Sequence, residues 1–386
     1  MRNTTPQQYK ARGTELGIDQ PVLTNSLNTI ERIKSVDARL FPLLTLNHLS
    51  VETGVSYGYL RKAIGRKINT YSHFYLKKRL PGRRNMRFIN VPHKPLLKCQ
   101  RWISDNILRY GAVHNASYAY HPKSSPILAA KLHVSAHWLI KVDIHDFFHG
   151  ISEHKVYRVF RSLGYARLLS LELARLCTLP CEKHSGHNAV PTMDERYKIN
   201  YYKTPYLGIV PQGAPTSPML SNLVMRDIDE ALATLATKMN MRFSRYADDI
   251  VFSCTDAREK ASVNTVKRRI LQIINQGGFR PNLRKTVVRG PGTRKIVLGI
   301  MVDGKEPKLP KEYKDKIRLH LHYLAHPKFG PSSHANARKT SISKIYHHVL
   351  GLIYWARAVE PDFGNEALLK FNDVSWPPIS KTKYFD

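Results

Sequence analysis

The chain has few cysteines and no long apolar segment. Its 386 residues include four cysteines, which are too few and too scattered for a disulfide framework and fit a reducing compartment. No apolar run is long enough to cross a membrane, and the N-terminal segment MRNTTPQQYKARG contains no apolar signal core. We therefore expect a cytoplasmic protein with no membrane partner.

Acidic residues are scarce as well. Asp and Glu total 29 against 61 Lys and Arg, which gives a formal net charge of +32 and a pI of about 10.1. A surface this basic releases counterions when it contacts phosphates, so it binds polynucleotides in a salt-dependent way. Aromatic residues are interleaved with basic ones over residues 71–87 and 313–323, which suits the stacking of bases beside cations. The composition predicts a nucleic-acid partner.

Some of the few acids are concentrated in two apolar segments. Residues 245–253 read RYADDIVFS and place Asp248 beside Asp249, while residues 139–148 read LIKVDIHDFF and end an apolar strand at Asp143. The first pattern predicts a β-hairpin with the acid pair at its tip. Taken alone, the pair fits a solvated turn equally well. With the second strand it predicts a site for two divalent ions, and carboxylate oxygens suit Mg²⁺, with Mn²⁺ as a substitute.

A loop rich in proline and glycine lies between these strands. Residues 208–222 read GIVPQGAPTSPMLSN, and a helix cannot begin there until Ser217, a good N-cap, and Pro218 in its first turn. Such a loop lets the backbone approach a nucleotide and its template base closely. Together with the acidic strands it indicates nucleotidyl transfer.

These three motifs, in this order, resemble those of bacterial reverse transcriptases of the retron and defence-associated group. The matching stretches are Asp143 to Phe148, Pro211 to Pro218 and Tyr246 to Asp249. The resemblance covers roughly residues 45 to 360. It also includes a fingers segment at 71–92, a helix at 97–108, a motif with Asn282, Lys285 and Thr286, a primer-grip strand at 297–302, and the thumb residues Gly351, Leu352 and Tyr354.

The resemblance implies an RNA-directed DNA polymerase with a right-hand α+β fold, in which helices back an antiparallel palm sheet. We expect an N-terminal helical extension over residues 1–70, fingers and palm over 71–303, and a helical thumb over 304–386. Apolar residues at helical spacing predict a thumb helix near 340–359.

The resemblance also implies roles for individual residues. Asp143 and Asp248 should hold both metal ions, with Asp249 and the backbone of Ile144 completing the site. Phe148 matches the aromatic gate that excludes a ribose 2′-hydroxyl. The other expected nucleotide contacts are Asp146, Phe147, Gln212, Gly213, Lys77, Arg87 and Lys285, although strand alternation sends Phe147 toward the core. The expected nucleic-acid contacts are Tyr246, Lys314, Lys316, Arg318, Lys339 and Lys344.

The partners that the resemblance implies are a dedicated noncoding RNA as template, with an RNA primer as a further option, dNTPs and a DNA product. An effector protein of a defence operon and a second copy of the chain are further candidates.

Two positions depart from the retron pattern. Residues 129–133 read AAKLH where retrons have Asn-Ala-x-x-His, and residues 297–299 read VLG where they have Val-Thr-Gly. Both departures remove polar contacts, so other phage-defence reverse transcriptases are an equal alternative.

Two further alternatives concern the whole chain. A group II intron-like maturase would be expected to carry an endonuclease segment, and none is recognisable. An RNA-binding scaffold with a vestigial polymerase site would not need the repulsive cluster of Asp143, Asp248 and Asp249.

Two short segments allow more than one interpretation. Residues 177–187, CTLPCEKHSGH, approach a zinc-ligand pattern, but they are more crowded than an ordinary zinc finger, and a loop insertion over 181–205 is the main interpretation. Residues 46–64 fit either a helix-turn-helix DNA reader or helices that cap the fingers, and we favour capping.

Overall fold

The computed structural model describes residues 6–77, 86–122, 124–180 and 207–378. The helices before the palm loop are α1 Pro6–Glu15, α2 Gln20–Val36, α3 Leu46–Thr53, α4 Tyr57–Ile64, α5 Lys94–Asn106, the 3₁₀ turn η1 Leu108–Tyr110, α6 Pro126–Lys131, α7 Glu153–Ser162 and α8 Arg167–Leu176. The later helices are α9 Ser217–Lys238, α10 Lys260–Gln276, α11 Lys311–Ala325, α12 Gly330–Ala337, α13 Ile342–Val359 and α14 Pro361–Asn372. The strands are β1 Tyr71–Lys77, β2 Met86–Pro92, β3 Trp138–Asp143, β4 Leu179–Pro180, β5 Gly208–Ile209, β6 Arg242–Tyr246, β7 Asp249–Cys254, β8 Val287–Arg289, β9 Ile296–Val297 and β10 Ile300–Met301.

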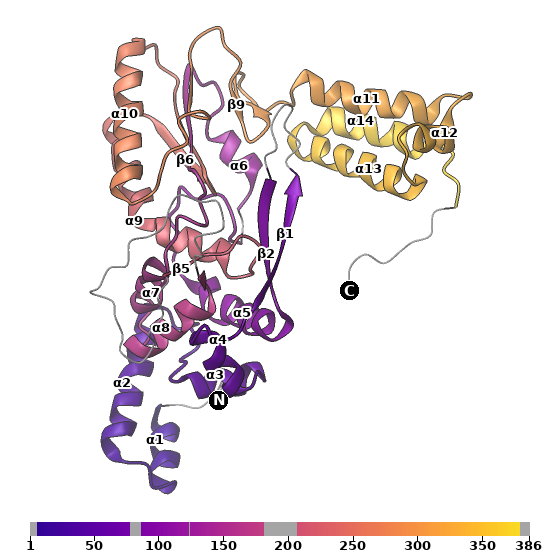
Figure 1. Ribbon diagram of the computed structural model, residues 1–386. Helices are drawn as coiled ribbons and strands as arrows, with labels where there is room; N and C mark the ends of the chain where they lie inside the picture. Colours follow the sequence, from indigo (N-terminus) through magenta and orange to yellow (C-terminus); the bar gives the residue numbers. More distant parts are fainter. Residues whose placement is uncertain (1–5, 78–85, 123, 181–206, 379–386) are drawn as a thin grey trace.

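A four-stranded antiparallel sheet in the order β6-β7-β3-β8 forms the centre of the molecule. Alternate residues of its strands face opposite sides. Ile140 and Phe252 lie in the main core with α9 and α10, which flank the sheet in Figure 1. Leu139 and Val251 face the other way, into a second core shared with β9 and β10. β6 and β7 form the hairpin that the sequence predicts.

The N-terminal helices cover the lower part of the main body in Figure 1. α3 and α4 pack on α5 and α8, and Leu49, Leu60 and Ile64 are buried in the main core. Arg66 joins α4 to the palm through an ion pair of 2.8 Å with Glu153. The structure therefore favours the capping interpretation of these helices over DNA reading.

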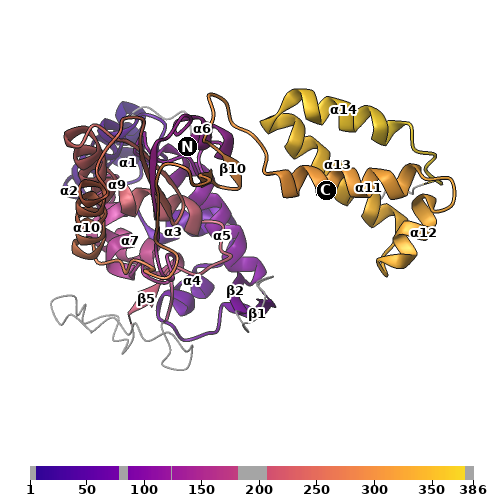
Figure 2. The same cartoon turned by 90° about the horizontal axis from the view of Figure 1, so that it is seen from above.

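Helices α11 to α14 form a separate bundle beside the palm (Figures 1 and 2). Its apolar residues, among them Ile317, Val349 and Phe371, pack on one another. Leu309, in the segment that enters α11, belongs to the same core as Val302 at the end of the palm. The helix expected near residues 340–359 is α13.

The cysteines bear on the candidate zinc segment, and the described helices bear on the expectation of no membrane-spanning segment. Cys99, Cys177 and Cys254 are buried free thiols, and burial raises the pKa of Cys177 to about 12. A group this hard to ionise is a poor zinc ligand. The rest of the candidate zinc segment, residues 181–187, lies outside the described residues. None of the helices in the described ranges is long and apolar enough to cross a membrane.

His133 fastens the segment after α6 to the palm sheet. Its ring is fully buried, with Nδ1 2.7 Å from Ser253 Oγ on β7 and Nε2 2.7 Å from Ser244 Oγ on β6. Burial, helped by the charge of Arg242, lowers the pKa of His133 to about 3. The chain thus keeps the histidine of its altered AAKLH motif as a neutral structural group.

We expect acid to weaken the fold through His133. Its folded-state pKa of about 3 lies below the ordinary 6.5, so the unfolded chain binds a proton that the folded chain does not. The stabilisation is complete above the ordinary value and is lost as the pH falls toward the folded-state value. Relative to His133→Gln, wild type should lose up to about 1.4 kcal/mol of unfolding free energy per pH unit in that window. Urea titrations at several pH values measure both slopes, and equal slopes would contradict this role.

Candidate active site

Three carboxylates meet at one end of the palm sheet. β3 ends at Asp143 and β7 begins at Asp249, and the two residues are paired in the antiparallel register, so they share one face of the sheet. Asp248 lies in the turn directly before Asp249. It follows Ala247, whose φ of 56° lies in the left-handed region. The N–H of Ile144 donates to the carbonyl of Asp248 over 3.1 Å, which ties the turn to the end of β3.

Two lysines and an amide bind these carboxylates. Lys285 Nζ lies 2.9 Å from Asp143 Oδ2, and Asn282 Nδ2 donates to Asp143 Oδ1 over 3.0 Å. Lys141 Nζ lies 2.9 Å from Asp249 Oδ1. Since Lys141 and Asp143 are two residues apart on β3, both side chains point to the same face. Positive charge therefore offsets part of the repulsion between the carboxylates.

The site is nevertheless short of positive charge. Burial raises the pKa of Asp248, and the charges of Asp249 and Asp143 raise it further. Burial alone would lower the pKa of Lys285, but its bond to Asp143 and the charges of the carboxylates outweigh burial and raise it. Both shifts favour a more positive site. The arrangement can accept a cation with oxygen ligands.

The donor set fits a hard divalent ion. Three carboxylates match the oxygen ligands that Mg²⁺ takes and lack the sulfur and nitrogen ligands typical of zinc. As the side chains lie, no three His, Cys, Asp or Glu residues in the described part of the chain form a ready metal cage. Lys285 and Lys141 bond two of the carboxylates instead.

The residues after β3 turn away from the sheet. Asp146 has a φ of 46°, and its carboxylate lies 3.0 Å from Nδ1 of His145. Phe147 is only 5% exposed and belongs to the main core, as expected, but β3 ends at Asp143, so the turn and not strand alternation sends it there. Phe148 is half-buried, and its ring centroid lies 6.3 Å from that of Tyr120. Phe148 is therefore the aromatic residue of this segment that a nucleotide can reach.

The loop before α9 docks on the fingers. The carbonyl of Gln212 accepts from the N–H of Asn90 on β2 over 2.8 Å. Gly213 has a φ of 115°, and a Cβ there would come within 2.8 Å of the Asn90 carbonyl oxygen, so only glycine fits. The N-cap of α9 is Thr216 and not Ser217. Ser217 instead donates its hydroxyl to the carbonyl of Pro211 over 2.6 Å, which holds the loop closed.

Three predicted contacts lie near the acid pair or on the fingers. Arg87 is exposed on β2, and Tyr246 ends β6 opposite Asp249. Lys77 ends β1, and its side chain lies outside the described residues. Burial and the charge of Asp248 raise the pKa of Tyr120, and Arg87 partly offsets this. The charges of Arg87 and Asp248 therefore both reach Tyr120.

Two of the thumb cations predicted to contact nucleic acid are engaged within the thumb. Lys314 on α11 forms an ion pair with Glu360 at the start of α14. Arg318 lies 3.0 Å from Asp315. The charged groups of both cations also lie 5.4 Å from the ring centroid of Phe363. Lys314 thus helps to hold α11 on α14, whereas Arg318 pairs within α11 and its side chain stays 60% exposed.

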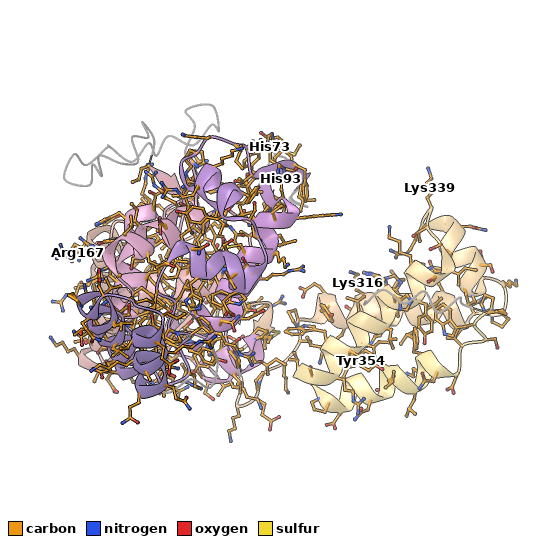
Figure 3. The ribbon with its side chains drawn as sticks, turned by 90° about the horizontal axis from the view of Figure 1, so that it is seen from below. His73, His93, Arg167, Lys316, Lys339 and Tyr354 are labelled. Carbon is orange, nitrogen blue, oxygen red and sulfur yellow. The ribbon has the colours of Figure 1, made fainter. Side chains whose placement is uncertain are left out.

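The other three predicted thumb cations are exposed. Lys316 lies on α11, while Lys339 and Lys344 flank the start of α13. In Figure 3, Lys339 projects from the thumb on the same side of the view as His73 and His93 of the fingers. These three lysines and Arg318 are the predicted thumb cations whose side chains are exposed to solvent.

Three residues beside the carboxylates have roles that were not predicted from the sequence. Lys141 has a signal in the sequence, because a lysine two residues before Asp143 on a strand must share its face. Asn282 is part of a recognised motif, but its bond to Asp143 could not be anticipated. Tyr120 has a φ of 66°, and nothing in the sequence marks it.

Comparison with known proteins identifies the family. The family model for reverse transcriptase (RNA-dependent DNA polymerase) matches residues 76–302, more than half of the chain. The chain is 27% identical to the retron Ec86 reverse transcriptase of Escherichia coli over 329 residues, which cover 84% of this chain and 92% of that protein. It is 29% identical to the retron Mx162 reverse transcriptase of Myxococcus xanthus, covering 71% of this chain and 57% of that protein.

The retron Mx65 reverse transcriptase of the same organism is 28% identical, covering 82% of this chain and 69% of that protein. The α+β architecture around an antiparallel palm sheet agrees with the right-hand polymerase fold that the sequence predicts. Reverse transcriptases use divalent metal ions and copy an RNA template into a DNA product. The chain belongs to the reverse transcriptase family and is an RNA-directed DNA polymerase similar to those of retrons.

Proposed function

We propose that this reverse transcriptase copies a dedicated noncoding RNA into DNA as part of a bacterial antiphage defence system, with two Mg²⁺ ions bound at Asp143, Asp248 and Asp249. The observation that carries the metal site is the convergence of these carboxylates with a raised pKa at Asp248. The similarity to retron reverse transcriptases over most of the chain supports the dedicated RNA. It also favours a retron over other defence reverse transcriptases and over a maturase.

In this proposal Asp143 and Asp248 hold both ions, and Asp249 and the backbone of Ile144 complete the ligand set. Bound there, the pair of ions activates the primer 3′-hydroxyl and stabilises the leaving pyrophosphate. Lys285 exchanges the Asp143 carboxylate for phosphate oxygens of the nucleotide, whose negative charge favours the protonated ammonium as Asp143 does in the free protein. Mn²⁺ can replace Mg²⁺ because both accept oxygen ligands.

The remaining residues bind and select the nucleotide. Phe148 lies under the sugar and excludes a 2′-hydroxyl, while Gln212 and Gly213 border the nascent base pair. Asp146 follows the triphosphate, and Arg87 and Lys77 approach it from the fingers. The loop that carries Gln212 is already docked on β2, so little ordering is needed when a nucleotide binds.

The partners follow from the same proposal. The RNA template contacts the exposed cations of the thumb, and a product DNA strand forms on it from dNTPs. An effector protein and a second copy of the chain are further candidate partners. The intact, repulsive acid cluster argues against a scaffold with a vestigial site, because binding alone would not maintain it.

Replacing Asp248 and Asp249 together with Ala should abolish dNTP incorporation and leave RNA binding unchanged, since the cationic surface is distributed over fingers and thumb. Asp227→Ala, an exposed acid on α9, is the control and should keep full activity. Asp248→Asn alone should lose activity yet raise the unfolding temperature, because the buried charge is unfavourable in the folded state. Primer extension, RNA binding and thermal unfolding measure these effects. Synthesis by the double variant would disprove the metal site.

Phe148→Ala should raise the use of rNTPs relative to dNTPs on the order of tenfold or more, because it opens space for a 2′-hydroxyl. Phe147→Leu is the matched control, since the neighbouring ring is buried in the core and its loss should affect stability without changing sugar selection. Single-nucleotide incorporation with both substrates gives the ratio. Unchanged discrimination in a folded, active Phe148→Ala enzyme would assign the gate to another residue.

Replacing Lys316, Lys339 and Lys344 with Glu should erase any preference for RNA transcribed from beside the gene over unrelated RNA of equal length. Generic binding through phosphates weakens with salt, so competition at moderately high salt exposes the specific contacts. The matched control replaces Lys238, Lys260 and Arg268 with Glu, on α9 and α10 at the far side of the palm from the thumb (Figure 1). We expect the preference to persist in wild type and in the control variant and to be lost from the thumb variant. Its survival in the thumb variant, or its absence from wild type, would refute the thumb as the specificity element.

A further inference from the structure

Arg245 is the largest fully buried side chain in the described part of the chain. It lies on β6, two residues before Ala247. Its Nε and Nη2 donate to the two carboxylate oxygens of Asp229 on α9, over 2.7 and 2.6 Å, and both side chains are completely buried. The pair therefore links the catalytic hairpin to the helix that follows the proline-rich loop.

The third nitrogen of the guanidinium reaches the turn itself. Arg245 Nη1 donates to the carbonyl of Ala247 over 3.1 Å and to Oδ1 of Asn222 over 3.2 Å. Ala247 has the left-handed backbone that residues with a side chain rarely adopt, and its carbonyl carbon begins the peptide of Asp248. Holding that carbonyl fixes the direction in which Asp248 leaves the turn.

Asn222 extends the link to the segment that carries Tyr120. Its Oδ1 accepts from Ser117 Oγ over 3.0 Å, and its Nδ2 donates to the carbonyl of Ala119 over 2.7 Å. The backbone of Arg245 is also paired with this segment, through the N–H of Tyr118 over 2.8 Å. One buried polar cluster thus joins the acid turn, α9 and the segment that places a ring against Phe148.

A buried ion pair of this kind is weak evidence for stability, because apolar residues of similar volume often stabilise a core as well or better. Its distinguishing property is directional: four hydrogen bonds of one planar group reach a carboxylate, an amide and one carbonyl of the turn. We propose that Arg245, held by Asp229, is a positioning residue that sets the orientation of Asp248 toward the metal ions. This inference rests on the proposed metal site.

The test replaces both charges with apolar side chains of similar length, Arg245→Met together with Asp229→Leu. This variant leaves no buried charge unpaired, so the fold should persist with an unfolding temperature close to that of wild type. The contact with Ala247 is lost, however. Mn²⁺ affinity of the nucleotide-free protein, measured by electron paramagnetic resonance, should fall about 10- to 100-fold. The half-saturating Mg²⁺ concentration should rise to a similar extent.

Steady-state kinetics should show a split. At subsaturating metal, kcat should fall about 100-fold, while the KM for dNTP stays within about threefold of wild type, since the fingers and Phe148 are untouched. Arg245→Lys keeps the charge without the fork, so it should lie between wild type and the apolar pair. The matched control is Glu172→Gln. Glu172 is a buried carboxylate on α8 that pairs with Arg61 of α4 at 3.6 Å, and its replacement should leave metal affinity unchanged.

Wild-type Mn²⁺ affinity and kcat in the folded apolar pair would overturn the inference. If that variant does not fold, Arg245→Lys and Asp229→Asn assayed below their unfolding temperatures decide the matter, and wild-type metal affinity in both would overturn it. The outcome is separable from that of the proposed site. An inactive Asp248 and Asp249 variant beside normal Arg245 variants refutes only the positioning role.

Discussion

The structure depends on one unfavourable interaction, the approach of Asp143, Asp248 and Asp249 at the end of β3 and β7. Like charges this close destabilise a fold unless cations are present. The antiparallel pairing of β3 with β7 enforces the approach, because directly opposed residues cannot separate without breaking the ladder. The palm sheet thus supplies the free energy that keeps the carboxylates together, and Lys285 and Lys141 neutralise part of their charge until metal ions bind.

The surrounding elements rest on this strand pair in a consistent way. One face is covered by α9 and α10, and the opposite face carries the second core at Leu139 and Val251 and, at its end, Lys141, Asp143 and Asp249. The loop before α9 binds the fingers through Gln212 and Asn90. The same helix reaches the acid turn through Asp229 and Arg245. α9 therefore relates the loop of Gln212 to the turn of Asp248, the proposed nucleotide pocket and metal site, and a displacement of it would move both.

The sequence predicted what local chemistry determines. The hairpin at Asp248, the helix after the proline-rich loop and the helix near residues 340–359 follow from β-formers, from proline and from apolar spacing. It did not predict interactions between distant segments. Thr216 occupies the N-cap position of α9 without a side-chain capping bond, and Ser217, the expected cap, donates to the Pro211 carbonyl across the closed loop. The engagement of Lys314 with Glu360 joins two helices whose packing no local pattern encodes.

The thumb shows why net charge alone cannot account for RNA selection. A formal charge of +32 draws any polyanion to the protein. Yet Lys314 is paired with Glu360 and lies over the ring of Phe363, so its charge is partly offset where α11 packs against α14, whereas Arg318 stays exposed beside Asp315. Exposed cations such as Lys316 remain for phosphates. On the proposed role of the thumb, recognition depends on how these exposed cations are spaced along a folded RNA. The packing of α11 on α14 that engages Lys314 with Glu360 also gives the exposed cations of the thumb a defined geometry.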